Sequence, residues 1–131
     1  MTKLRVMLVD DHPVVRKGLR ALLEGEPDME VVGEAGDGTQ AVELAQTLKP
    51  DIITMDISMP EMDGLEATRR IRRLDAYRDT PIIALTADAF ESERQRYLDA
   101  GMSDHLAKPL QAARLYTALA QWLATAPGRR A

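Results

Sequence analysis

Five polar side chains come directly after short apolar runs, at the point where each run ends. If these runs are parallel strands of one sheet, their carboxyl ends meet at one edge and bring the five side chains together. Three carboxylates, a hydroxyl and an ammonium group in one cleft would suit a divalent cation and a phosphoryl group. The five residues are Asp10, Asp11, Asp56, Thr86 and Lys108.

Each of these residues also has a simpler explanation when it is taken alone. The Asp10-Asp11 pair could cap a helix, and Asp56 could be an acid in a turn. Thr86 could be an ordinary strand residue, and Lys108 could be a solvated lysine in a loop. The simpler explanation is weaker for the whole set, because unrelated causes would have to place all five at the ends of four runs.

The chemistry of these groups explains why they would occur together. Three close carboxylates repel one another, and some would stay protonated unless a cation neutralised them. Mg²⁺ suits a site of oxygen ligands that keeps several waters. Asp56 would then be ionised and could form an aspartyl phosphate as a nucleophile. Lys108 would bind the phosphoryl oxygens, Thr86 would donate a hydrogen bond to the product, and the small Ala87 would leave room for the donor.

The apolar runs alternate with longer stretches of helical period, five times along the chain. The first, third and fourth runs are almost continuously apolar, which is typical of strands covered on both faces. Five such units in strict alternation predict an α/β fold with a doubly wound, five-stranded parallel sheet. The runs lie near 4–9, 30–35, 51–55, 81–85 and 104–107.

The sequence also predicts where the helical stretches begin and which of their faces are buried or solvated. Asp11 is a good N-cap for the first, and Pro13 fits its first turn. The fourth stretch, about 88–100, is thinly apolar and would pack loosely. One buried face of the first helix is predicted for Val14, Val15, Leu19, Leu22 and Leu23. A solvated side of the third helix is predicted for Arg69, Arg70, Arg72 and Arg73.

Composition favours one cytoplasmic domain. Hydrophobic residues make up 45% and charged residues 29% of the 131 residues, which is ordinary for a globular protein. The absence of cysteine excludes disulfides and thiol nucleophiles, and the net charge of −4 gives no reason to expect direct nucleic-acid binding. No apolar run approaches the ~18 residues of a membrane span. We expect one domain at 1–124 and a flexible tail at 125–131.

The same residues carry a resemblance to a known family. The Asp10-Asp11 pair, the loop at 56–64, the pair at 86–87 and the pair at 108–109 resemble the receiver domain of two-component response regulators. The resemblance covers about residues 4–123, with the order and spacing of the family. It implies a flavodoxin-like (βα)5 fold with strand order 2-1-3-4-5.

The resemblance also implies roles for single positions. Asp56 would accept a phosphoryl group from a phosphohistidine on a sensor histidine kinase or a histidine phosphotransfer protein. Mg²⁺, or Mn²⁺ in its place, would be bound by Asp11, Asp56 and the backbone carbonyl of Ser58, with Asp10 acting mainly through a bound water. Lys108 would pair with the phosphate, and its peptide bond to Pro109 would be cis.

The resemblance further implies a switch and positions that tune it. Thr86 would turn toward the phosphate on activation, and the residue three before the lysine would move inward with it. The family usually has tyrosine or phenylalanine there, whereas this chain has His105. Imidazole titrates near pH ~6.5, so the switch could be pH-sensitive, but a tolerated planar substitute is the favoured interpretation. Ser58 and Asp88 resemble positions that tune dephosphorylation.

Three other signals are set aside. The segment 36–41 matches the letters of a dinucleotide-binding turn, but it follows the second run, and a turn with Asp37 as N-cap is favoured. The arginines of the third helix and Arg78 could form a nucleic-acid stripe, but a solvated face suits an acidic chain better. His12 beside two acids could indicate a transition-metal site, which would usually need a second nearby histidine.

We therefore predict a phosphorylation-controlled interaction module and not an enzyme, beyond Mg²⁺-dependent self-phosphorylation and autodephosphorylation. A haloacid-dehalogenase-type phosphatase would need a second acid where this chain has Ser58, and a flavodoxin-type protein would need a hydroxyl-rich loop after the first run. The predicted output face combines the fourth helix, the fifth strand and the fifth helix. It would bind an unknown downstream protein or form a phosphorylation-dependent homodimer. A stand-alone regulator is favoured over a receiver excised from a DNA-binding regulator or a hybrid histidine kinase.

Overall fold

The computed structural model describes residues 3–59, 62–74, 80–86, 91–108 and 111–121. Five strands alternate with five helices along these residues, as the sequence predicts. The elements are β1 (Leu4–Val9), α1 (Pro13–Glu24), β2 (Met29–Ala35), α2 (Gly38–Leu48), β3 (Ile52–Asp56), α3 (Gly64–Arg72), β4 (Ile82–Thr86), α4 (Glu91–Ala100), β5 (Asp104–Ala107) and α5 (Ala112–Ala120).

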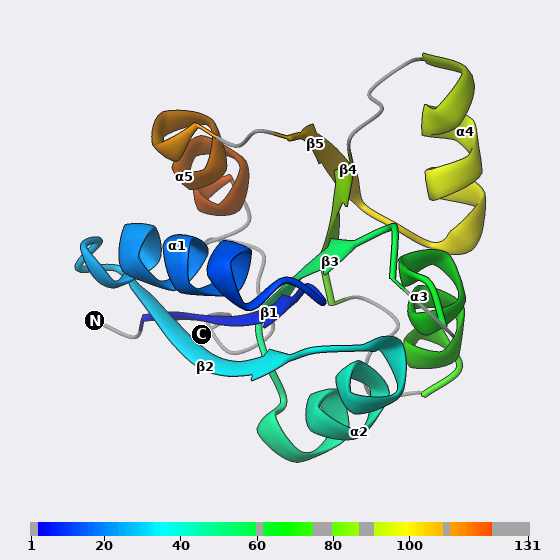
Figure 1. Ribbon diagram of the computed structural model, residues 1–131, viewed down its shortest axis with the longest axis horizontal. Helices are drawn as coiled ribbons and strands as arrows, with labels where there is room; N and C mark the ends of the chain where they lie inside the picture. The colour runs from blue at the N-terminus through cyan, green and yellow to red at the C-terminus, as the bar shows by residue number, and fades with distance from the viewer. Residues whose placement is uncertain (1–2, 60–61, 75–79, 87–90, 109–110, 122–131) are drawn as a thin grey trace.

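The strands form one parallel sheet in the order β2-β1-β3-β4-β5, which confirms the predicted doubly wound, flavodoxin-like topology. Helices α1 and α5 cover one face of the sheet, and α2, α3 and α4 cover the other (Figure 1). The order of connections reverses at β1 and β3, where such sheets place their ligands outside the carboxyl ends of the strands.

Two aliphatic clusters form the core, one on each face of the sheet. All residues of β3 and β4 are buried, because helices cover both faces of these central strands. On α1, Leu19 and Leu23 are buried as predicted, but Val14 is 81% and Leu22 is 38% exposed. The predicted single buried face was too wide, since at about 100° per residue Val14 lies well away from Leu19 around the helix.

The N-terminus of α1 also differs from its prediction. The N-cap is His12 and not Asp11, and Pro13 occupies the start of the helix as expected. His12 has an extended backbone, and its side chain makes no capping hydrogen bond. The prediction for α2 is confirmed, because the Asp37 side chain accepts a hydrogen bond from the Gln40 backbone N–H at 2.8 Å. The segment 36–41 is therefore a turn and a cap.

Arg72 does not lie on a solvated face, which corrects the prediction for α3. Its Nε donates to the carbonyl of Gly101 at 2.9 Å, and its other nitrogens donate to the carbonyl of Thr80 and to Ser103 Oγ. These contacts tie α3 to the segments that precede β4 and β5. Arg69 and Arg70 are exposed as predicted and pair with Glu66.

No helix among the described residues is both long enough and apolar enough to cross a membrane. The predicted domain boundary at 124, the tail at 125–131 and Arg78 fall outside the described residues, as do the first residues of the predicted fourth helix, 88–90.

Candidate functional site

Three carboxylates gather at the carboxyl ends of β1 and β3. These strands are neighbours, with Val9 paired to Met55, so the residues that follow Val9 lie beside Asp56. Asp10 is fully buried and Asp56 is 2% exposed, whereas Asp11 is half-buried. Single ligand atoms of Asp10, Asp11, His12 and Asp56 all lie within 4.8 Å of one another. The structure therefore brings together the three acids that the sequence singles out.

Lys108 completes this cluster from the far side of β4. Its Nζ lies 3.2 Å from Asp10 Oδ2 and 3.2 Å from Asp56 Oδ1. Because β4 separates β3 from β5, the side chain has to reach across the end of β4. Its backbone N–H donates to the carbonyl of Thr86 at 2.7 Å, which holds the backbone from which the side chain extends. The predicted lysine is therefore in direct contact with two of the three carboxylates.

The electrostatics of the cluster are unbalanced. Burial, together with the nearby charge of Asp10, raises the pKa of Asp56, although Lys108 and the Ser58 N–H oppose this rise. Burial lowers the pKa of Lys108, but the charges of Asp56 and Asp10 outweigh it and leave the pKa raised. A single lysine ammonium group thus lies beside two buried carboxylates, and its one positive charge does not neutralise the charge of both.

The two oxygens of Asp56 have different surroundings. Oδ1 accepts hydrogen bonds from Lys108 Nζ and from the Ser58 backbone N–H, both at 3.2 Å. Oδ2 is buried and has no hydrogen-bond partner among the described residues. A buried oxygen without a partner costs about 1–3 kcal/mol, so a group that binds to Oδ2 recovers that energy. An all-oxygen donor set of this kind fits Mg²⁺.

The loop after β3 is closed back onto Asp56 by Gly64. The Gly64 N–H donates to the carbonyl of Ile57 at 3.1 Å. A Cβ atom at position 64 would collide with the carbonyl oxygen of Asp56 and lie 3.0 Å from its carbonyl carbon. Asp63 caps α3 by accepting from the Glu66 N–H at 2.9 Å. The sequence indicated this loop as part of the pattern, but not that its glycine packs against the backbone of Asp56.

His12 faces the cluster more closely than the sequence indicated. Its Nδ1 lies 3.1 Å from Asp10 Oδ1 and 3.0 Å from Asp11 Oδ1, while its side chain is 63% exposed. Its backbone N–H also donates to Asp10 Oδ1 at 2.8 Å. These contacts orient Asp10. An all-oxygen ligand set, which the sequence favours over a transition-metal site, stays a prediction.

Thr86 ends β4 and is buried, with 5% of its surface exposed. Its hydroxyl forms a buried hydrogen bond of 2.9 Å with the hydroxyl of Tyr97, in α4. The Tyr97 ring lies against His105, with ring centroids 6.0 Å apart and planes tilted by 52°. The sequence describes the stretch that contains Tyr97 only as thinly apolar and does not indicate this contact. The available signal was the phenolic hydroxyl itself, because a tyrosine hydroxyl that becomes buried usually finds a hydrogen-bond partner.

Several predicted site residues cannot be compared with the structure. Ala87, Asp88 and Pro109 lie outside the described residues, so the proposed donor space, the tuning role of Asp88 and the cis peptide bond stay predictions. Ser58 is described and exposed, and its backbone N–H binds Asp56. Cation binding by its carbonyl also stays a prediction.

Comparisons with known proteins agree with this fold and site. The model of the response regulator receiver domain matches residues 6–120. The transcriptional regulatory protein LiaR of Bacillus subtilis is 45% identical over 116 residues, which are 88% of this chain and 54% of LiaR. The chain therefore spans about half the length of this relative.

Solved structures of receiver domains and of a chemotaxis protein are also similar to this chain. The receiver domain of the sensor histidine kinase PA1611 of Pseudomonas aeruginosa is 40% identical, with a TM-score of 0.82 over 92% of this chain and 98% of that one. It was solved with a magnesium ion coordinated in its active site cleft. The chemotaxis protein CheY4 of Vibrio cholerae is 30% identical, with a TM-score of 0.86 over 92% and 98% of the two chains.

The chain belongs to the response regulator receiver domain family. Its acidic pocket of Asp10, Asp11 and Asp56 is the phosphorylation pocket of a receiver domain in a two-component phosphorelay. This pocket is also consistent with a Mg²⁺ site like that of the related receiver domain solved with the ion.

Replacing Asp56 with asparagine is expected to raise the free energy of unfolding of the metal-free protein by about 1 kcal/mol. The reason is that the fold holds the Asp56 carboxylate out of water and close to Asp10, which raises its pKa and destabilises the charged form. Urea unfolding in EDTA measures this effect. Added Mg²⁺ should shrink the difference, because a cation bound at Asp56 would stabilise the protein that keeps the carboxylate more than the variant. A variant less stable than the wild type in EDTA would contradict the prediction.

Proposed function

We propose that Asp56 accepts a phosphoryl group from the phosphohistidine of a sensor histidine kinase or a histidine phosphotransfer protein. The observation that carries this proposal is the buried Asp56 Oδ2, which has no hydrogen-bond partner among the described residues, in a carboxylate whose other oxygen is held by Lys108. In the transfer, a carboxylate oxygen of Asp56 forms the new bond to phosphorus, the nitrogen–phosphorus bond breaks, and the donor leaves as imidazole.

The residues around Asp56 have separate tasks in this reaction. The Lys108 ammonium group would move from Asp10 to the phosphoryl oxygens, because a single phosphoryl group carries more negative charge than the Asp10 carboxylate does. Mg²⁺ would be held by Asp11, Asp56 and the Ser58 carbonyl, with Asp10 acting through water. It would supply positive charge between the carboxylate and the incoming phosphoryl group. Mn²⁺ would fit the same oxygen ligands. Self-phosphorylation from small donors and slow autodephosphorylation would use the same groups.

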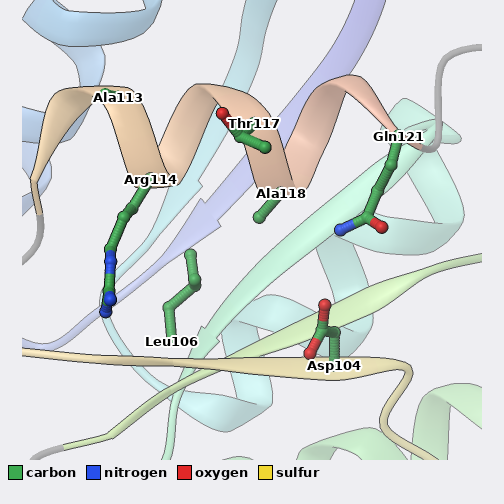
Figure 2. Close-up of a pocket in the computed structure, with 7 residues that line it drawn as sticks. All are labelled: Asp104, Leu106, Ala113, Arg114, Thr117, Ala118 and Gln121. Atoms are coloured by element: carbon green, nitrogen blue, oxygen red, sulfur yellow. The ribbon is translucent and has the colours of Figure 1, made fainter.

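The proposed output is the surface of α4, β5 and α5. A groove of about 360 Å³ lies on this surface between the edge strand β5 and α5 (Figure 2). It has a mainly apolar floor with Leu106 and Ala118, and Asp104 and Arg114 supply opposite charges. The groove supports the binding of a downstream protein or a phosphorylation-dependent homodimer. The full lining is Asp104, Leu106, Ala113, Arg114, Thr117, Ala118 and Gln121.

The favoured subtype is a stand-alone cytoplasmic regulator that acts by binding a protein. The alternative is a receiver module that belongs to a DNA-binding regulator or to a hybrid histidine kinase. Similar chains of both kinds support the alternative, because LiaR is a transcriptional regulatory protein and PA1611 is a sensor histidine kinase.

The experiment that tests this function is incubation with acetyl phosphate and Mg²⁺, followed by intact mass measurement. The wild type should gain one phosphoryl group that is stable in acid and labile in base, and EDTA should prevent the gain. Asp56→Asn should gain none. Asp63→Asn is the matched control, since it changes an acid in the same loop and keeps the capping oxygen on the Glu66 N–H. No adduct on the wild type, or an undiminished adduct on Asp56→Asn, would overturn the proposal.

A further inference from the structure

The backbone of Thr86 is held on the side of β5. Its carbonyl accepts a 2.7 Å hydrogen bond from the Lys108 N–H, and the residue pairs with Ala107 in the ladder. The preceding residue, Leu85, is paired with Asp56 of β3. On phosphorylation we therefore expect a change at this position in the side-chain rotamer. The hydroxyl group is the part of Thr86 that can exchange one partner for another.

Among the described residues, Tyr97 is a hydrogen-bond partner of the Thr86 hydroxyl. The two oxygens are 2.9 Å apart and the bond is buried. Tyr97 is 3% exposed and packs in the core cluster between the sheet and helices α2, α3 and α4. Its ring also lies against His105 of β5. Among the described residues, the side chain of Thr86 thus contacts Tyr97 of α4 directly. His105 packs behind this contact, against the tyrosine ring.

The far end of α4 is anchored. The carbonyl of Tyr97 accepts from the Met102 N–H at 3.1 Å, and the Gly101 carbonyl accepts from Arg72 of α3 at 2.9 Å. Ser103 continues the anchor by donating its N–H to the Ile82 carbonyl at 2.8 Å. These contacts hold the turn between α4 and β5 while the Tyr97 side chain reaches toward the site. Tyr97 therefore links the phosphorylation pocket to the proposed output surface.

The Thr86 hydroxyl has a single proton to donate. A phosphoryl group on Asp56 would offer charged oxygens, and hydrogen bonds to charged acceptors are stronger than those between two neutral hydroxyls. Whichever of the two hydroxyls donates in the present bond, turning the threonine hydroxyl toward the phosphoryl group would move it away from Tyr97. The tyrosine hydroxyl would then lose this buried partner, which favours a shift of its ring and of α4.

We propose that the hydrogen bond between Tyr97 and Thr86 is a latch that holds the unphosphorylated state, and that Tyr97 is the positioning residue for Thr86 in place of the residue at 105. The proposal rests on the function proposed above, in which Asp56 is the phosphoacceptor. It assigns the coupling between pocket and output surface to a residue of α4. His105 packs against the tyrosine ring, so its effect on the threonine hydroxyl would pass through that ring.

The test is the affinity for beryllofluoride, which imitates the phosphoryl group, in the presence of Mg²⁺. Tyr97→Phe removes only the hydroxyl and keeps the buried ring. Without the latch, the unphosphorylated state loses a hydrogen bond that the bound state does not use, so binding should tighten about three- to tenfold. Calorimetric titration of the wild type, Tyr97→Phe, Thr86→Val and the double variant gives the four affinities.

The Thr86→Val background separates a latch from ordinary packing. With no threonine hydroxyl to hold, Tyr97→Phe should leave the affinity unchanged in this background. An equal gain in both backgrounds would show that Tyr97 acts through packing, and would overturn the proposal. An unchanged or weakened affinity in Tyr97→Phe alone would also overturn it. If the wild type binds no beryllofluoride, or Asp56→Asn binds it equally well, the proposed function fails and the latch fails with it.

Discussion

Replacing Lys108 with methionine is expected to slow phosphorylation of Asp56 by about 100- to 1,000-fold, the usual cost of removing one preorganised charge from a reaction centre. The ammonium group lies 3.2 Å from Asp56 Oδ1, beside the place where the negatively charged phosphoryl oxygens would arrive. Methionine keeps most of the length of the side chain and removes its charge. The measurement is the initial rate of adduct formation from acetyl phosphate, followed by quenching and intact mass.

Two control variants show whether the slower phosphorylation of Lys108→Met comes from the lost charge at position 108. Lys17→Met removes an exposed lysine of α1 and should leave the rate unchanged. Lys108→Arg keeps the positive charge but changes its geometry, so it should fall between the wild type and the methionine variant. A Lys108→Met variant that is phosphorylated as fast as the wild type would exclude Lys108 from the reaction.

Replacing Gly64 with alanine is expected to lower the free energy of unfolding by about 3 kcal/mol. The new methyl group would collide with the carbonyl oxygen of Asp56 and lie 3.0 Å from the Cα of Ile57, and both are backbone atoms that cannot rotate away. The same displacement would move the phosphoacceptor, so phosphorylation should slow as well. Urea unfolding at equilibrium measures the change in stability.

Gly18→Ala is the matched control for this substitution. Gly18 lies within α1, and a Cβ atom there would meet nothing within 4 Å. Alanine at an unobstructed helical position should raise the free energy of unfolding by about 0.5–1 kcal/mol. The two glycine variants are thus expected to change stability in opposite directions. Equal effects at both positions would contradict the close approach of Gly64 to Asp56.

The fold and the composition of the pocket could be predicted because both depend on strand ends. Parallel strands place their carboxyl ends at one edge, so the residues after four apolar runs define a cluster without any knowledge of side-chain paths. The contacts of Lys108 with Asp10 and Asp56 follow from that arrangement.

Contacts that depend on the path of one side chain could not be predicted. Arg72 belongs to a run of arginines in the sequence, but only the structure shows its guanidinium between the turns that precede β4 and β5. Tyr97 meets Thr86 from another element, 11 residues away in sequence. Helical period indicates which side of a helix is buried, but it does not indicate which hydroxyl lies opposite.

The position of the aspartyl phosphate in the chain decides whether Asp56 is the phosphoacceptor. After incubation with acetyl phosphate and Mg²⁺, borohydride reduces an acyl phosphate to an alcohol and converts the modified aspartate to homoserine. Peptide sequencing by mass then locates it. Homoserine is expected at position 56 alone. Homoserine at Asp10, Asp11 or Asp63, with position 56 unchanged, would contradict the assignment of Asp56 as the phosphoacceptor.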